Sequence, residues 1–327
     1  MKTPHIVCYG EILLRFIIEN DFGKNKTLPY FLGGSELNVA RHLANFDISS
    51  HFTSVLPANF LSEKLLDLLK NEKINTNNIF LENERIGIFY APKNGDMQNQ
   101  NIIYDRLNSA FYKANPTIFN WTKILQNKHH FHTSAISPAL NKMQFKICLQ
   151  AFKTAVSFGL NTSLDLNYRK TLWQYTQFPH KFINQLLPYC NTILGNIWAV
   201  EKLVEIKTNI QSSAGVSIPK LIETAELQIK KLIQKFPNIK NVAYTFRLEQ
   251  YYFAILYMNN KFEVSTVYNR IQTSDSVGSG DSFMAALLYG IYKNLSSKKI
   301  AELCCQIVLE KLSKEGDFVP INISIKN

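Results

Sequence analysis

The cysteines of this sequence lack the spacing of a metal site or of a disulfide framework. There are only five, Cys8, Cys148, Cys190, Cys304 and Cys305, and they suggest neither a zinc module nor a disulfide-stapled domain. We therefore expect five buried core thiols in a protein of a reducing compartment.

Long apolar runs, a signal-peptide pattern, repeats and low-complexity tracts are missing too. No segment has the length and hydrophobicity to span a bilayer, so we expect no membrane segment and a cytoplasmic protein. Because no linker is visible, the 327 residues are predicted to form a single domain, 1–327, with a small lid.

The net charge is +11, but no dense run of basic residues carries it. Lysines are scattered among Asn and Ile, and no nucleic-acid-binding module is present. We expect a generally basic enzyme for anionic small molecules, with no nucleic-acid partner. The 46% hydrophobic and 19% charged residues indicate a globular rather than a disordered chain.

A histidine cluster at residues 129–132 (HHFH) has the composition of a metal site. No second group of ligands accompanies it in the sequence. We interpret it as a strand whose histidines alternate between faces, and we predict no resident metal ion.

The most informative stretch is a glycine-rich turn at residues 275–283 (DSVGSGDSF) before an apolar segment predicted to be a buried helix. The main-chain N–H groups of Gly278, Ser279 and Gly280, at the positive end of that helix, would bind an anion. Asp281 lies in the first turn, where its carboxylate suits removal of a proton from a hydroxyl group. A plain turn and helix cap is the alternative.

A second glycine pair, Gly33-Gly34, precedes a predicted helix over residues 35–46, with Ser35 as its N-cap. The glycines would let a ligand approach the main chain, and Asn38 in the first turn can both donate and accept hydrogen bonds. An ordinary strand-to-helix turn is the alternative.

Two strands without an intervening helix are predicted between residues 85 and 106. We expect them to pair with the extended stretch near the N-terminus and form a lid from about 12–33 and 85–110 that excludes water over a bound substrate. Tyr90, Tyr104 and Arg106 are predicted to share one face, where they could hold a hydroxylated carboxylate. They could equally be ordinary strand aromatics and a solvated charge.

The rest of the chain alternates strands and helices, as expected of an α/β protein. One predicted strand, over residues 161–166, leads into Asp165-Leu166-Asn167-Tyr168-Arg169. Open α/β sheets bind ligands at the carboxyl ends of their strands, and Arg169 is a natural bidentate partner for a carboxylate or phosphate. Loop capping is the alternative.

These motifs carry a family resemblance. Residues 33–40 (GGSELNVA) resemble the N-terminal signature of the PfkB, or ribokinase-like, sugar kinases, and residues 277–283 (VGSGDSF) resemble their C-terminal signature. Within that family the chain is most similar to 2-keto-3-deoxygluconate kinases. The segments that follow this subgroup are residues 10–15 (GEILLR), 104–110 (YDRLNSA), 165–173 (DLNYRKTLW) and 316–318 (GDF).

The resemblance implies a ribokinase-like fold, with a mostly parallel sheet between helices and a small β-sheet lid. It also implies ATP-dependent phosphorylation of the primary hydroxyl of a sugar acid, with Asp281 as general base and Gly278, Ser279 and Gly280 as anion hole. The residues implied to bind the sugar acid are Gly34, Asn38, Tyr90, Tyr104, Arg106, Arg169 and Asp317. Those implied to bind nucleotide are Asn167, Asn196, Thr245 and Arg247. Arg106 and Arg169 together would neutralise the keto-acid carboxylate.

The sequence departs from the family on the ATP side. Where relatives have Asn-Glu-x-Glu, this chain has Asn196-Ile197-Trp198-Ala199, and residues 246–251 lack the glycines that many relatives use against the nucleotide. The missing acids would reduce protein contacts to Mg²⁺, which we expect to be carried on ATP.

Two alternatives to a sugar-acid kinase therefore remain: a kinase for fructose or another neutral sugar, and a catalytically impaired relative that binds sugar acid. A homodimer or higher homo-oligomer is expected through the exposed lid strands.

Overall fold

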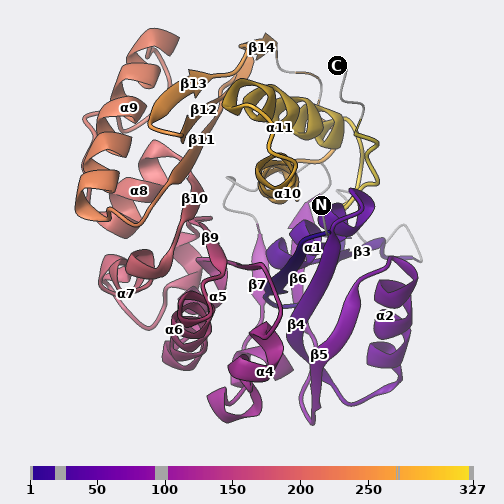
Figure 1. The fold of residues 1–327 in the computed structure, drawn as a ribbon. Helices are drawn as coiled ribbons and strands as arrows, with labels where there is room; N and C mark the ends of the chain where they lie inside the picture. Colours follow the sequence, from indigo (N-terminus) through magenta and orange to yellow (C-terminus); the bar gives the residue numbers. More distant parts are fainter. Residues whose placement is uncertain (1–2, 19–26, 93–101, 270, 272, 324–327) are drawn as a thin grey trace.

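The computed structural model describes residues 3–18, 27–92, 102–269, 271 and 273–323 (Figure 1). Within these ranges a ten-stranded sheet has the order β13-β12-β11-β10-β9-β8-β1-β4-β5, with β14 also paired to β12. Neighbouring strands are parallel along the stretch β11-β10-β9-β8-β1-β4-β5 of this sheet. Strand β12 runs antiparallel to β11, β13 and β14. The bounds are β1 (His5–Tyr9), β4 (Ser49–Pro57), β5 (Asn75–Glu82), β8 (His130–Ser134), β9 (Asn161–Asp165), β10 (Thr192–Gly195), β11 (Asn241–Arg247), β12 (Tyr251–Met258), β13 (Lys261–Val264) and β14 (Tyr268–Asn269).

Both faces of this central sheet are buried, because successive side chains of a strand point to opposite sides. In β1, Val7 and Tyr9 belong to one hydrophobic cluster, while Ile6 and Cys8 belong to another. All five cysteines are buried and free, which confirms that they are core thiols.

Helices cover the two faces, as Figure 1 shows. One face packs on α1 (Ser35–Asn45), α2 (Phe60–Asn71), α10 (Ser279–Tyr292) and α11 (Ser297–Leu312). The other packs on α3 (Ala110–Lys113), α4 (Trp121–Leu125), α5 (Ile136–Leu140), α6 (Lys142–Ser157), α7 (Pro179–Leu186), α8 (Ile197–Val204) and α9 (Ile218–Lys235). Short 3-10 helices are η1 (Pro116–Ile118), η2 (Lys170–Leu172) and η3 (Leu187–Tyr189). None of the described helices combines the length and the apolar character that a membrane crossing needs.

A second, small sheet has the order β3-β2-β6-β7. Its strands are β2 (Leu13–Ile18), β3 (Tyr30–Gly33), β6 (Gly87–Pro92) and β7 (Ile103–Asp105). The predicted pairing of the N-terminal stretch with the later hairpin is confirmed, since β2 pairs in parallel with β6 and β6 runs antiparallel to β7. Parts of the predicted lid, residues 19–26 and 93–101, lie outside the described residues.

His130 and His132 of the histidine cluster lie in a strand, β8, as predicted, whereas His129 precedes it. His130 Nε2 and His132 Nδ1 each lie 2.8 Å from the hydroxyl of Ser163, whereas His129 Nδ1 accepts the main-chain N–H of His5. Buried and paired with a serine hydroxyl, His130 and His132 have pKa values lowered to about 3, chiefly by burial. In the described part of the chain, no group of three or more His, Cys, Asp or Glu side chains could hold a metal ion.

Candidate active site

A cleft of about 1660 Å³ lies between the carboxyl ends of the central strands and the small sheet. Pockets for a single small ligand usually measure about 300–1,000 Å³, so this cleft has room for two ligands side by side. The central sheet contributes Asp165 and Asn167 after β9, Asn196 after β10, and Thr245 and Arg247 at the end of β11; the small sheet contributes Leu13, Phe89 and Tyr104.

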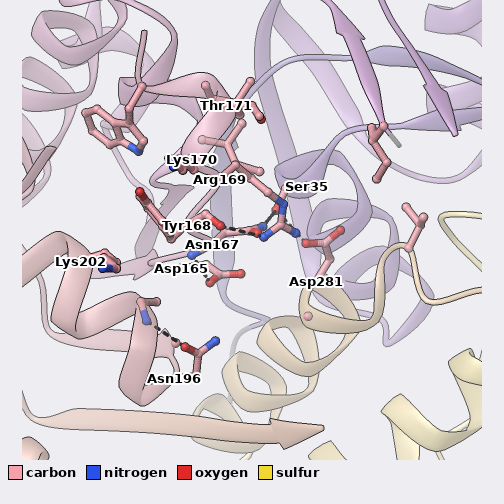
Figure 2. A pocket seen from close by; sticks show the side chains of 18 of the residues that line it. Ser35, Asp165, Asn167, Tyr168, Arg169, Lys170, Thr171, Asn196, Lys202 and Asp281 are labelled. Carbon is pink, nitrogen blue, oxygen red and sulfur yellow. Dashed lines mark hydrogen bonds between the residues drawn. The ribbon is translucent and has the colours of Figure 1, made fainter. Parts of the chain in front are cut away.

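Asp281 lines this cleft from the first turn of α10 (Figure 2). Its carboxylate is buried and accepts hydrogen bonds from Ser35 Oγ at Oδ1 (2.7 Å) and from Asn38 Nδ2 at Oδ2 (2.8 Å). Burial raises the pKa of Asp281 to about 6, although the two hydrogen bonds act in the opposite direction. The group is therefore ionised at neutral pH, yet basic enough to accept a proton from a hydroxyl group.

The prediction that Ser35 caps α1 is wrong. The N-cap is Gly34, at φ +137°, and no side chain caps the helix there. Ser35 is the first helical residue, and its hydroxyl donates to the buried carboxylate of Asp281, a charge-assisted hydrogen bond. A Cβ at Gly34 would lie 2.2 Å from the carbonyl oxygen of Glu11, so only glycine fits this turn.

The turn before α10 also requires glycine. Gly278 has φ +80° and is the N-cap of α10, and a Cβ there would lie 1.9 Å from the carbonyl oxygen of Asp317. Gly278, Ser279 and Gly280 all line the cleft. The first N–H groups of a helix have no partner within it, so this end of α10 can bind an anion beside Asp281.

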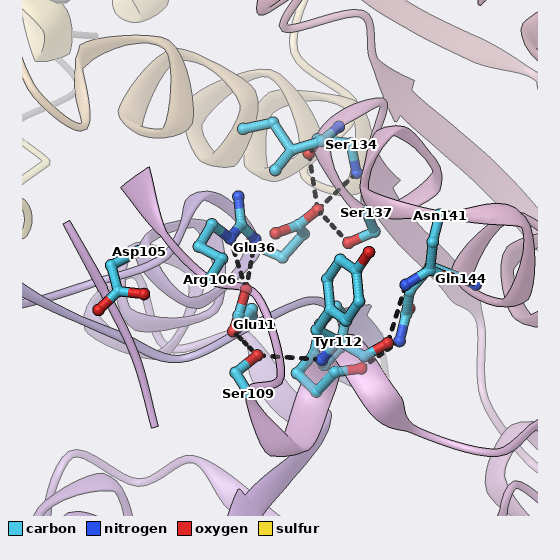
Figure 3. Close-up of polar contacts among 12 residues, drawn as sticks. Glu11, Glu36, Asp105, Arg106, Ser109, Tyr112, Ser134, Ser137, Asn141 and Gln144 are labelled. Atoms are coloured by element: carbon cyan, nitrogen blue, oxygen red, sulfur yellow. Dashed lines mark hydrogen bonds and ion pairs between the residues drawn. The ribbon is translucent and has the colours of Figure 1, made fainter. Parts of the chain in front are cut away.

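Arg106 lines the cleft as predicted, but its charge is already compensated. Its Nε and Nη2 both contact Glu11 Oε2 at 2.6 Å, and Ser109 Oγ donates to Glu11 Oε1 at 2.5 Å (Figure 3). Both side chains of the ion pair are buried. Arg106 therefore reaches the cleft already paired with Glu11, a residue far away in the sequence, and the expected neutralisation of a carboxylate by Arg106 and Arg169 together stays a prediction.

Arg169 keeps donors for a ligand. Its Nη1 donates to the carbonyl of Tyr168 (3.1 Å), while its Nε is buried without a hydrogen-bond partner. Figure 2 shows its side chain lying toward Ser35 and Asp281. A buried guanidinium N–H without a partner is costly, so an anionic ligand group at this position would be stabilised.

Asp165 is a cleft residue to which the sequence analysis assigned no role. It is buried, and its Oδ1 accepts the main-chain N–H of Asn167 (3.0 Å). Its Oδ2 faces the start of α10, 3.9 Å from the position of a Cβ at Gly280. Burial raises the pKa of Asp165 to about 7, and the neighbouring charge of Asp281 adds to the effect. The sequence does contain a signal for a role of Asp165, because this residue lies near the carboxyl end of a predicted strand, where α/β sheets bind ligands.

Glu36, which also lines the cleft, is a second acid without a predicted role, and Figure 3 shows its polar contacts. Its Oε1 accepts from the N–H (2.9 Å) and hydroxyl (2.7 Å) of Ser134 and from Ser137 Oγ (3.2 Å). Gly10 leaves the space that Glu36 occupies, since a Cβ there would lie 2.1 Å from Glu36 Oε2. Glu36 thus ties α1, which carries Ser35 and Asn38, to the end of β8.

The predicted nucleotide residues also line the cleft. Asn167 Nδ2 donates to Ser35 Oγ (3.2 Å), and Thr245 and Arg247 reach the cleft from β11. Asn196 also lines it, but its Oδ1 caps α8 by accepting the N–H of Ala199 (2.8 Å). Lys202 of α8 is a further cation of this region that the sequence analysis missed.

Of the two tyrosines predicted on the sugar side, Tyr90 is placed differently from expectation. Tyr104 lines the cleft and pairs with Phe89, whereas Tyr90 pairs with Ile103 and is absent from the lining. Cross-strand partners share a face, so Tyr90 lies on the opposite face from Tyr104, stacked on Phe16 at 5.8 Å. The prediction that Tyr90 and Tyr104 share a face is wrong.

Asp317 lines the cleft as predicted, but its carboxyl group already has a partner in the protein. Its Oδ1 lies 2.8 Å from Nε of Arg15 in β2. Burial raises the pKa of Asp317 to about 7, although Arg15 lowers it.

Comparison with known proteins identifies the family. The family model described as "pfkB family carbohydrate kinase" matches residues 3–316. The chain belongs to the pfkB family of carbohydrate kinases. As a member of this family it is a phosphotransferase that acts on a sugar hydroxyl group.

Individual pfkB relatives differ in substrate. The crystal structure of 2-dehydro-3-deoxygluconokinase from Thermotoga maritima has a TM-score of 0.85 and 30% identity, covering 97% of this chain and 96% of that one. A 2-dehydro-3-deoxygalactonokinase from Haloferax volcanii is 27% identical over 175 residues, 52% of this chain and 54% of that protein, so this match spans about half the length of that relative. A probable fructokinase-3 from Arabidopsis thaliana is 23% identical over 89% of this chain and 79% of its own. The expected ribokinase-like fold is confirmed.

Proposed function

We propose that this pfkB protein is an ATP-dependent 2-keto-3-deoxygluconate kinase that phosphorylates the primary hydroxyl of the sugar acid. The observation that carries the proposal is the pairing of Asp281, held by Ser35 and Asn38, with the guanidinium of Arg169 in the same cleft. The carboxylate of Asp281 can accept a proton from the hydroxyl group of any sugar. The guanidinium of Arg169 favours a sugar that bears a carboxylate. Similarity to the Thermotoga maritima 2-dehydro-3-deoxygluconokinase supports the same substrate.

Asp281 acts as the general base. The acceptor hydroxyl gives its proton to the Asp281 carboxylate, its oxygen forms a bond to the terminal phosphorus of ATP, and the bond from that phosphorus to the bridging oxygen breaks to release ADP. Ser35 and Asn38 keep the carboxylate oriented while this happens. The N–H groups at the start of α10 stabilise the negative charge of the phosphoryl group in transit.

The residues of the cleft fit a magnesium ion that is carried by the nucleotide. Magnesium in such sites is usually held by one or two carboxylates, water and substrate phosphates. Asp165 is a buried carboxylate beside the start of α10, with Oδ1 bonded to Asn167 and Oδ2 facing Gly280. Ile197 and Ala199, where relatives have acids, are buried and apolar. Asp165 would therefore hold the ion, which neutralises phosphate charge when bound.

The substrate assignment depends chiefly on Arg169. Arg106 already has Glu11 as its partner, so it contributes a hydrogen-bonding surface rather than an uncompensated charge. Tyr104 and Gly34 complete the sugar side of the cleft.

A kinase for a neutral sugar is the second candidate, favoured by the similarity to fructokinases and by the compensation of Arg106. Purified protein, ATP and Mg²⁺ should be tested on a panel of 2-keto-3-deoxygluconate, its galactose-derived epimer, fructose and ribose. We expect the highest kcat/KM for a sugar acid. Turnover of fructose with none of the acids would overturn the substrate assignment.

The catalytic role of Asp281 needs its own variant. Asp281→Asn should retain the affinity for sugar acid, measured by calorimetry, while kcat falls by about 10²–10⁴-fold because the base is lost. Asp67→Asn, on an exposed carboxylate of α2, is the matched control. If the wild type binds sugar acid but turns over none of the panel, the chain is an impaired relative.

A further inference from the structure

Lys311 is a completely buried lysine at the end of α11. Its side chain has no exposed surface, and its ammonium donates to the main-chain carbonyl of Asp275 (2.9 Å). A buried ammonium is expensive unless it is paired and hydrogen-bonded. A charged lysine in this position therefore needs acceptors and negative charges around it.

That environment is a buried cluster of two cations and two carboxylates. Arg15 of β2 contacts the Asp275 carboxylate through both terminal nitrogens and Asp317 Oδ1 through Nε (2.8 Å). Asp275 also accepts the N–H groups of Val277 (3.0 Å) and Gly316 (3.1 Å). Arg15 and Lys311 thus lie opposite two acidic side chains, Asp275 and Asp317, which compensate their positive charge.

The cluster lies directly behind the phosphoryl-binding turn. Asp275 is three residues before Gly278, and the carbonyl of Asp317 lies against Gly278, 1.9 Å from the position of a Cβ there. Ser274 joins the same two segments, because its N–H donates to the carbonyl of Leu312 (2.8 Å) and its hydroxyl to that of Ser313 (3.0 Å). Figure 1 shows α10 and α11 next to one another, as their packing in one core requires. Lys311 thus holds the main chain from which the anion hole is built.

We infer that the ammonium of Lys311 is a built-in cation that positions the turn of residues 275–280, and that it makes turnover independent of any soluble monovalent cation. A main-chain carbonyl beside two carboxyl groups is a set of oxygen ligands that attracts a cation. Here the tethered ammonium of Lys311 supplies that charge. It touches neither sugar nor phosphate, so it is a positioning residue.

The test uses Lys311→Met, which keeps most of the unbranched apolar side chain but lacks the terminal nitrogen and its charge. Lys299→Met, on an exposed lysine of the same helix, is the matched control. We expect kcat to fall by about 10²-fold, the loss typical of a disturbed oxyanion hole. The KM for the sugar should change by less than about threefold, because the sugar side of the cleft is untouched.

Rescue separates a cation role from a merely structural one. At constant ionic strength, NH₄⁺ or K⁺ should restore the kcat of Lys311→Met by at least about tenfold, whereas tetramethylammonium, too large for the space, should not. Full activity of the variant, or a folded variant that neither cation rescues, would overturn the inference. Circular dichroism and thermal unfolding establish whether the variant is folded.

The wild type gives a measurement that does not depend on any variant. Its kcat should be the same in K⁺ and in tetramethylammonium buffers, and activation by K⁺ would contradict a built-in cation. The inference rests on the phosphotransferase activity and not on the proposed substrate, so any sugar of the panel that is phosphorylated serves for the assay. A wrong substrate assignment is thereby distinguished from a wrong role for Lys311.

Discussion

The hydroxyl of Ser35 donates to Oδ1 of Asp281 over 2.7 Å, although 246 residues separate them. This hydrogen bond joins the starts of α1 and α10, the two helices that follow the glycine-rich turns. Together with Asn38, it orients the carboxylate that we assign as the base.

The pH dependence of kcat should report Asp281. Burial raises its pKa to about 6, and the active form is the carboxylate. The kcat of the wild type should therefore be level at neutral pH and fall as the pH drops through about 6. Ser35→Ala removes a hydrogen bond that favours the charged form, so its midpoint should move upward by about one pH unit. A midpoint that stays in place or moves down would contradict the role of Asp281 as base.

Arg106→Met should destabilise the protein by about 3–5 kcal/mol, because it leaves Glu11 buried and unpaired. Arg85→Met is the control: it breaks the partly exposed pair with Asp105, at 2.7 Å, and should cost about 0–1 kcal/mol. Adding Glu11→Gln to Arg106→Met should recover much of the loss. Urea unfolding measures all three, and equal costs for Arg106→Met and Arg85→Met would show that burial does not matter here.

Arg169→Met should affect sugar acids more than neutral sugars. Loss of a charge-assisted contact to a carboxylate is worth about 1.5–3 kcal/mol, so we expect kcat/KM for 2-keto-3-deoxygluconate to fall by about 10–100-fold. The value for a neutral sugar, if measurable, should change by less than about threefold. Steady-state kinetics on both sugars check this, and equal losses would mean that Arg169 serves the nucleotide instead.

Gly278→Ala should be much more harmful than Gly159→Ala. Both glycines have positive φ, +80° and +70°, but a Cβ at Gly159 meets nothing within 4 Å, whereas one at Gly278 would lie 1.9 Å from the carbonyl of Asp317. The shared backbone strain costs about 1–2 kcal/mol. We expect Gly159→Ala to show only that loss in denaturant unfolding, with normal kcat. Gly278→Ala should lose more stability and, because the anion hole must shift, at least about tenfold in kcat.

The outer face of the small sheet is proposed as a homodimer interface. Tyr30 and Ile103 on this face are each 64% exposed, and Phe16 lies between Tyr30 and Tyr90, at ring distances of 6.4 and 5.8 Å. An apolar face on exposed strands suits pairing with a second copy. Light scattering after size exclusion should give a dimer, and Ile103→Lys should convert it to a folded monomer whose thermal midpoint no longer depends on protein concentration. A monomeric wild type at working concentration would refute the interface.

Local pattern determined the main elements of this protein. The helix predicted over residues 35–46 is observed as α1 over Ser35–Asn45, and Gly34 and Gly278 do mark tight turns before α1 and α10, where a Cβ would clash with the main chain. These features depend on residues close together in the chain, where hydrophobic period and backbone sterics act directly. Strand β5 escaped prediction because its polar start, Asn75-Thr76-Asn77-Asn78, has the composition of a loop.

Only the tertiary structure decided which polar groups meet. The sequence contains Glu11, Arg15, Arg106 and Lys311, but nothing local to each shows that Arg106 faces Glu11 or that Lys311 reaches the carbonyl of Asp275. The face of Tyr90 likewise depends on the register of β6 with β7, where a shift of one residue reverses every side chain. The hydrophobic periodicity of a segment indicates which of its residues are buried. Which charged residues pair depends on the positions of segments far apart in the chain, and these positions are fixed only when the sheets assemble.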